Sequence, residues 1–206
     1  MEAQAHTHTE HYDPEGQKMG MWLFLLTELL VFGGLFIAYG MLSRRYRVEF
    51  IDGSQHLELI LGAVNTVVLL TSSLTVVLSI GALQRGDKRL SKLFLAATIG
   101  FAVVFLVIKS FEWSAKFHHG IYTTSDYWLK EMNSGSRMFY TLYFIMTGLH
   151  GFHVIVGGSL LAVCLAFIGK GKITRERHVL LENCALFWHL VDVIWIFLFP
   201  LFYLVR

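Results

Sequence analysis

The chain has 206 residues, of which 55% are hydrophobic and only 16% are charged, and its formal net charge is +2. Soluble domains carry about 25% charged residues, so this composition excludes an ordinary soluble domain and indicates a membrane protein. The near-neutral charge gives no basic field for nucleic acid, and we expect no nucleic-acid partner. Both cysteines, Cys164 and Cys184, lie in or beside apolar stretches, and we interpret them as small hydrophobic residues and not as a disulfide.

Residues 1–18 make up a polar N-terminal tail that contains His6, His8 and His11. A basic segment followed by a short apolar core is missing here, so we do not expect a secretory signal peptide. A short His-rich tract is able to bind metal, but these histidines have no fixed spacing, which favours a disordered tail.

Five apolar stretches follow, at residues 19–42, 57–83, 92–116, 138–168 and 179–205. A helix needs about 20 residues to cross the hydrocarbon core, and helices satisfy their own backbone in lipid. The sequence therefore predicts an all-α integral membrane protein, in which residues 19–206 form one five-helix transmembrane domain.

Basic residues in the connections indicate how the bundle is oriented. Connections 84–91 and 169–178 lie on one side and carry seven of them: Arg85, Lys88, Arg89, Lys170, Lys172, Arg175 and Arg177. Connection 43–56, on the other side, also has basic residues, which makes the bias modest. Because short cytoplasmic loops are enriched in Lys and Arg, we expect a cytoplasmic N-terminus and an outside C-terminus.

Polar and ionisable residues inside predicted spans are costly in lipid, so each is a candidate for function. The candidates are Glu28, Asn65, Lys109, Glu112, His150, His153, Glu182, His189 and Asp192. Several of these are three residues apart, which places their side chains on one helix face. We read the whole set as an intramembrane polar network.

Each candidate has a structural and a functional interpretation. Glu28 is either a proton-responsive or a structural carboxyl. Hydrogen bonding between helices is favoured over metal or haem ligation for His150 and His153. For the last span, a packed polar pair of His189 and Asp192 is favoured over a proton relay.

The spacing of the other ionisable residues also favours a structural role. Lys109 and Glu112 are predicted to form a charge-neutralising pair on one helix. Glu182 lies seven residues before His189 and shares its helix face. We predict neither a catalytic residue nor a metal site on this chain.

Five segments together resemble a known family. They are WLFLLTELLVFGGLFIAY (Trp22 to Tyr39), LGAVNTVVLLTSSLTVVLSI (Leu61 to Ile80), KSFEWSAKFHHG (Lys109 to Gly120), TGLHGFHVIVG (Thr147 to Gly157) and ENCALFWHLVDVIWIFLFPLFYL (Glu182 to Leu204). In this order they resemble subunit III of the haem-copper terminal oxidases, in its short five-helix bacterial form.

This resemblance implies a role inside a respiratory complex of the bacterial cytoplasmic membrane. Family members carry no haem or copper themselves, pack against the catalytic subunit I that holds both, bind phospholipid, and sustain proton uptake during turnover. Their carbodiimide-sensitive glutamate maps onto Glu28. Many members have seven spans and this chain matches from their third, so the resemblance leaves its lipid site undefined. Cytochrome c and quinol both stay open as electron donors.

Two alternatives stay open at this point. One is the related subunit III-like protein associated with nitric oxide reductase. The other is a five-helix b-type cytochrome, in which His153 and His189 would be the axial ligands of haem.

Overall fold

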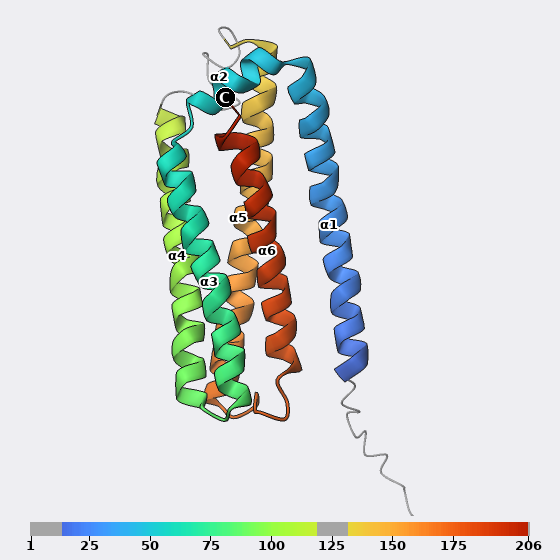
Figure 1. Cartoon of the computed structure of the whole chain (residues 1–206), viewed down its shortest axis with the longest axis vertical. Helices are drawn as coiled ribbons and strands as arrows, with labels where there is room; N and C mark the ends of the chain where they lie inside the picture. The colour runs from blue at the N-terminus through green and yellow to red at the C-terminus, as the bar shows by residue number, and fades with distance from the viewer. Residues whose placement is uncertain (1–13, 119–131, 206) are drawn as a thin grey trace, which may run out of the picture.

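The computed structural model describes residues 14–118 and 132–205, and these ranges are helical almost throughout. The helices are α1 (Pro14–Arg45), α2 (Arg47–Gln55), α3 (Leu59–Gln84), α4 (Lys88–His118), α5 (Ser134–Gly169) and α6 (Val179–Tyr203). All except α2 are long and apolar enough to cross a membrane, and they run side by side along the molecule (Figure 1). The predicted five-helix membrane bundle is confirmed.

Several helices extend beyond the apolar spans read from the sequence. The first begins at Pro14, where proline is favoured because the first helical residue needs no N–H partner, and α5 begins at Ser134. Hydropathy identifies only the part of a helix that lies in lipid, whereas backbone hydrogen bonding continues into the polar interface. These helices are therefore longer than their predicted spans, whereas α3 begins at Leu59 and α6 ends at Tyr203, each two residues inside the predicted bound.

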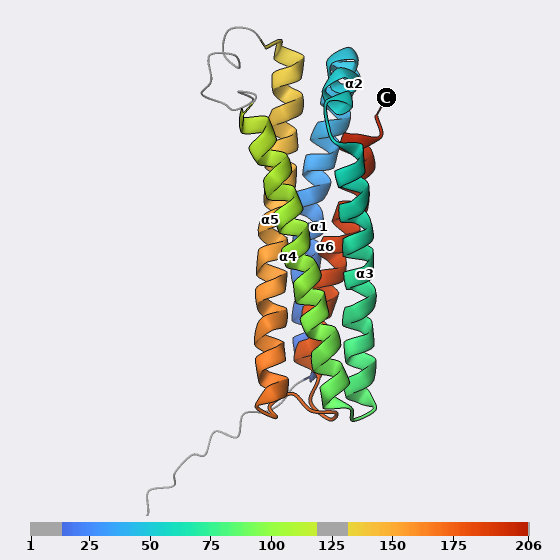
Figure 2. The ribbon, with the colours of Figure 1, turned by 90° about the vertical axis from the view of Figure 1, so that its left-hand side faces the viewer.

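Helix α2 was not predicted, because residues 43–56 were read as a connection. It lies across one end of the bundle (Figure 2). Its buried Phe50 makes edge-to-face contacts with Tyr39 of α1 and Phe139 of α5, at centroid distances of 5.3 and 5.4 Å. Gly53 lets α2 approach α5, since a Cβ at this position would lie 2.5 Å from the Phe139 ring. A single buried aromatic in a polar stretch is too weak a pattern to reveal such a helix.

A tight turn joins α3 to α4. Gly86 has φ of +89°, a left-handed conformation that glycine adopts without strain. The Asp87 carboxylate then accepts hydrogen bonds from the backbone N–H groups of Arg89 and Leu90, at 3.1 and 3.0 Å, and so caps α4.

Helices α3, α4, α5 and α6 form a four-helix group, and α1 packs against α5 and α6 at its side (Figure 1). Of the five long helices, α1 is the least buried and α6 the most. The start of α1 lies at the same end of the bundle as the α3–α4 and α5–α6 connections, and α2 lies at the other end (Figures 1 and 2). Connections 84–91 and 169–178 were predicted on one side of the bundle and connection 43–56 on the other, and the helices are arranged in this way.

Candidate functional sites inside the bundle

The carboxyl of Glu28 meets a histidine on another helix. Glu28 Oε2 of α1 lies 2.9 Å from His153 Nε2 of α5. The other ring nitrogen, Nδ1, lies 2.7 Å from the carbonyl oxygen of Leu149, to which it donates. A carbonyl oxygen only accepts, so a neutral His153 has its one N–H at Nδ1 and none at Nε2. The contact with Glu28 therefore requires one further proton, either on the histidine or on the carboxyl.

This pair is nearly enclosed. The side chains of Glu28 and His153 are 18% and 10% exposed, and the ring of Phe32 packs edge-on against the imidazole at 5.3 Å. The contact between Glu28 and His153 joins the middle of α1 to α5, and α1 is otherwise lightly packed. Other polar contacts of α1 lie at its ends, where Tyr39 donates to the Leu201 carbonyl and Lys18 pairs with Glu182.

A second polar cluster fastens α4 to α5 and α6. Lys109 Nζ lies 2.9 Å from Glu112 Oε2, which confirms the predicted pairing on one helix face. The same ammonium bonds to the hydroxyls of Tyr143 at 3.1 Å and Tyr203 at 2.6 Å, and both hydroxyls donate to Glu112 Oε1. Both charges are buried. The sequence did not reveal the two tyrosines, because tyrosine is common in apolar spans and their partners are distant along the chain.

In α6, His189 and Asp192 do not bond to each other in the described hydrogen bonds. His189 Nδ1 lies 2.6 Å from Ser73 Oγ of α3. Glu182, predicted on the same face, lies at the end of the helix and bonds to Lys18 at 3.0 Å and His178 at 3.1 Å. His189 and Asp192 therefore do not bond directly but both lie at Ser73 of α3, whereas Glu182 makes separate contacts at the end of the helix.

The tryptophans of α6 bond to hydroxyls of α3. Trp188 Nε1 donates to Ser72 Oγ and Trp195 Nε1 to Thr66 Oγ1, each at 3.1 Å. These bonds fix the register of α3 against α6. The hydroxyl side chains of α3 therefore do more than allow close helix packing, since they also accept hydrogen bonds from α6.

Asn65, His150 and Asp192 are also buried in the four-helix group, at 0%, 0% and 3% exposure. Their side-chain polar atoms have no hydrogen-bond partner within the described part of the chain. The imidazole of His150 instead contacts the rings of Phe105 and Trp195, at centroid distances of 5.4 and 5.1 Å.

The geometry bears on the haem alternative. Both ring nitrogens of His153 are engaged, with Glu28 and with a backbone carbonyl, so this histidine offers no free nitrogen to haem iron. Among the described residues, no group of three or more His, Cys, Asp or Glu side chains is arranged to hold a metal ion.

Cys164 and Cys184 face each other as free thiols with a sulfur–sulfur distance of 3.5 Å.

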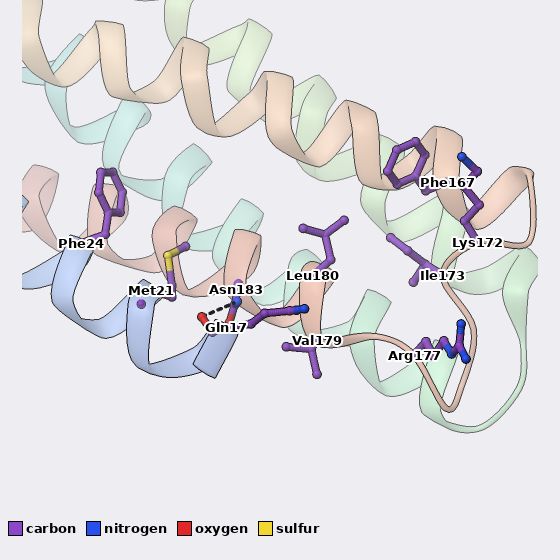
Figure 3. Close-up of a pocket in the computed structure, with 11 residues that line it drawn as sticks. Gln17, Met21, Phe24, Phe167, Lys172, Ile173, Arg177, Val179, Leu180 and Asn183 are labelled. Carbon is purple, nitrogen blue, oxygen red and sulfur yellow. Dashed lines mark hydrogen bonds between the residues drawn. The ribbon is translucent and has the colours of Figure 1, made fainter. Parts of the chain in front are cut away.

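A pocket of about 680 Å³ opens at the end of the bundle where α1 begins. Figure 3 shows apolar side chains from three helices, among them Phe24, Phe167 and Leu180, together with Lys172 and Arg177 of the α5–α6 connection. The side-chain amide of Asn183 in α6 donates to the Gln17 carbonyl of α1 across it, at 3.2 Å (Figure 3). The pocket combines apolar walls with two cations, which suits an amphiphilic anion.

Comparisons with known proteins give a consistent result. A model of the family described as cytochrome c oxidase subunit III matches residues 1–205. A cytochrome c oxidase subunit 3 of Thermostichus vulcanus is 31% identical over 195 residues, which are 94% of this chain and 90% of the relative. One from Corynebacterium diphtheriae is 30% identical, again over 94% of this chain and 90% of the relative.

Relatives from animals are longer than this chain. The cytochrome c oxidase subunit 3 of Sus scrofa is 32% identical over 197 residues, which are 92% of this chain and 69% of the relative. All of these similarities favour the oxidase family over the protein associated with nitric oxide reductase.

Proposed function

This chain belongs to the cytochrome c oxidase subunit III family, and we propose that it is a non-redox accessory subunit of a respiratory haem-copper oxidase that stabilises subunit I and supports its proton uptake. Haem and copper then reside on partner subunits, where oxygen reduction is coupled to proton pumping. The proposed location is the bacterial cytoplasmic membrane. The proposed orientation places the start of α1, with the basic connections such as that of Lys172 and Arg177, on the cytoplasmic side.

The observation that supports a protonic role is the contact between Glu28 and His153. Because His153 Nδ1 is engaged by a carbonyl, this pair holds one proton more than a neutral histidine beside a carboxylate. A carboxyl and an imidazole in hydrogen-bond contact inside the membrane are the chemical groups that a proton-exchanging site uses. Such a site works without redox chemistry, in keeping with an accessory role.

The substitution Glu28→Gln tests this role in the assembled complex. Glutamine keeps the size and a hydrogen bond to His153, but it cannot share a proton with the ring. We expect normal assembly, with slower proton uptake and faster loss of oxidase activity during turnover in reconstituted vesicles. Asp52→Asn, at an exposed acid of α2, is the control and is expected to change neither rate. Wild-type proton uptake and activity in assembled Glu28→Gln complex would refute the protonic role.

We also propose that the pocket of Figure 3 receives an anionic phospholipid. Lys172 and Arg177 would bind the phosphate, and the apolar wall with Phe24 and Phe167 would pack against the acyl chains. The pocket lies at an end of the bundle, which is where the proposal requires a lipid headgroup. Membrane lipid is thus a second expected partner, beside subunit I.

Lipid retained by the purified complex tests this proposal. The double substitution Lys172→Gln and Arg177→Gln is expected to lose co-purifying anionic phospholipid. The matched control is Lys170→Gln with Arg175→Gln, which removes two charges from the same connection but none from the pocket wall. Equal lipid content in both double variants would exclude the pocket as the lipid site.

A further inference from the structure

Three buried side chains of the four-helix group have hydrogen-bonding capacity that the described part of the chain does not use. They are Asn65 of α3, His150 of α5 and Asp192 of α6, and all their side-chain nitrogen and oxygen atoms are without a partner. None is more than 3% exposed. Buried polar atoms in folded proteins are almost always bonded to protein or to ordered water. Six such atoms in one bundle therefore need partners that the described residues do not fully supply.

The three residues lie at similar levels along the bundle, near that of Trp195. The indole of Trp195 bonds to Thr66, the residue after Asn65, at 3.1 Å. Its ring centroid lies 5.1 Å from that of His150. Asp192 precedes Trp195 by about one turn of α6. Each of the three is thus next to, or within a turn of, a residue at this level.

Neighbouring donors are already engaged elsewhere. The indole N–H groups of Trp188 and Trp195 serve Ser72 and Thr66. The Lys109 ammonium bonds to one carboxylate and two tyrosine hydroxyls. Ser73 lies beside Asp192 and 2.6 Å from His189 Nδ1, and its single hydroxyl proton serves at most one oxygen of the Asp192 carboxyl.

The three side chains can satisfy one another only in part. An amide, a neutral imidazole and a carboxylate together offer about three donor hydrogens against about seven acceptor sites. A protonated Asp192 changes these to about four and six, so acceptors stay in excess. Water can supply donors to acceptors that no side chain reaches, because each molecule donates two hydrogens and bridges groups that do not touch.

We propose that ordered water occupies the interior around Trp195 and bridges Asn65, His150 and Asp192. The site is a hydrated chamber within the membrane, formed by α3, α5 and α6. Ser73 joins it to His189, which lines a groove between α1 and α6 together with Trp22 and Leu186. That hydrogen-bonded connection gives the enclosed water a polar route to the surface of the bundle.

A cryo-electron microscopy map of the unmodified oxidase complex, at a resolution that shows ordered water, is the direct test. We expect water density within hydrogen-bond distance of Asp192 and of at least one of Asn65 and His150. Direct bonds among the three side chains, with no water density between them, would overturn the proposal.

Hydroxyl-radical labelling of the same complex gives an independent readout, because radicals formed from enclosed water oxidise side chains that bulk solvent does not reach. Trp195 is only 1% exposed, yet we expect it to be oxidised. Phe139, fully buried among aromatic rings, is the dry reference after correction for intrinsic reactivity. Trp195 labelling no higher than that of Phe139 would overturn the proposal.

Two substitutions of Asp192 separate hydration from other causes of labelling. Asp192→Leu removes the polar group that holds water, and oxidation of Trp195 should fall to the reference level. Asp192→Asn keeps two polar atoms and should keep the labelling. Unchanged labelling in Asp192→Leu would count against the chamber, and the unmodified complex decides the matter if that variant does not assemble.

Discussion

Removal of the Lys109 ammonium should destabilise the bundle strongly. In the substitution Lys109→Met, Glu112 stays in place with its side chain only 1% exposed and loses the cation that lies 2.9 Å away. Loss of one partner of a buried ion pair costs about 3–5 kcal/mol, because the other charge is left without compensation. The hydroxyls of Tyr143 and Tyr203 continue to donate to Glu112, so we expect the lower part of this range, about 3 kcal/mol.

The double variant Lys109→Met with Glu112→Gln distinguishes a stranded charge from a general packing defect. It removes both charges, and glutamine still accepts from the tyrosines, so most of the lost stability should return, leaving a deficit of about 1 kcal/mol. Lys18→Met is the control, because the Lys18–Glu182 pair has side chains that are 50% and 24% exposed. An exposed pair of this kind contributes about 0–1 kcal/mol.

The assay is denaturant-induced unfolding of the chain in the detergent-solubilised complex, with Lys109→Met, Glu112→Gln, the double variant and Lys18→Met compared side by side. A loss in Lys109→Met no larger than in Lys18→Met would refute the reasoning. So would a double variant whose loss equals the sum of its single substitutions.

Two further substitutions test packing and capping. A Cβ at Gly157 would lie 2.8 Å from the Trp188 ring, so Gly157→Ala should cost about 1–3 kcal/mol in the same assay, whereas Gly100→Ala, with open space around it, should be neutral or stabilising. Equal effects of the two alanines would contradict the close approach of α5 and α6. Asp87→Ala should lower the free energy of unfolding by about 1 kcal/mol because it removes the cap of α4, whereas Asp87→Ser should keep most of the stability of the cap. If the serine and alanine variants are equally destabilised, loss of the cap is not the cause of the destabilisation.

The sequence was sufficient to predict the membrane-spanning helices, because their apolar length has no other explanation in a chain of this composition. It also predicted the pair of Lys109 and Glu112, whose spacing of three residues places them on one helix face. Contacts between residues on the same helix face are predictable in this way, because they depend only on the local spacing of residues. The same reasoning could not reveal α2, whose only buried aromatic residue is Phe50.

Partners from distant parts of the chain were not predictable from spacing. Glu28 and His153 are 125 residues apart, and the contact depends on how α1 packs beside α5. Tyr143 and Tyr203 join the Lys109 cluster for the same reason. His189 bonds to Ser73 of α3, beside which Asp192 also lies, and this shared partner was not predictable because the orientation of a helix within a bundle is set by packing.

Purification of the native complex that contains this chain tests its assignment most directly. We predict co-purification with a large membrane subunit that carries haem and copper, and a chain that shows no haem absorption when separated from it. A native complex without a haem-copper subunit, or a separated chain that retains haem, would contradict the proposed role.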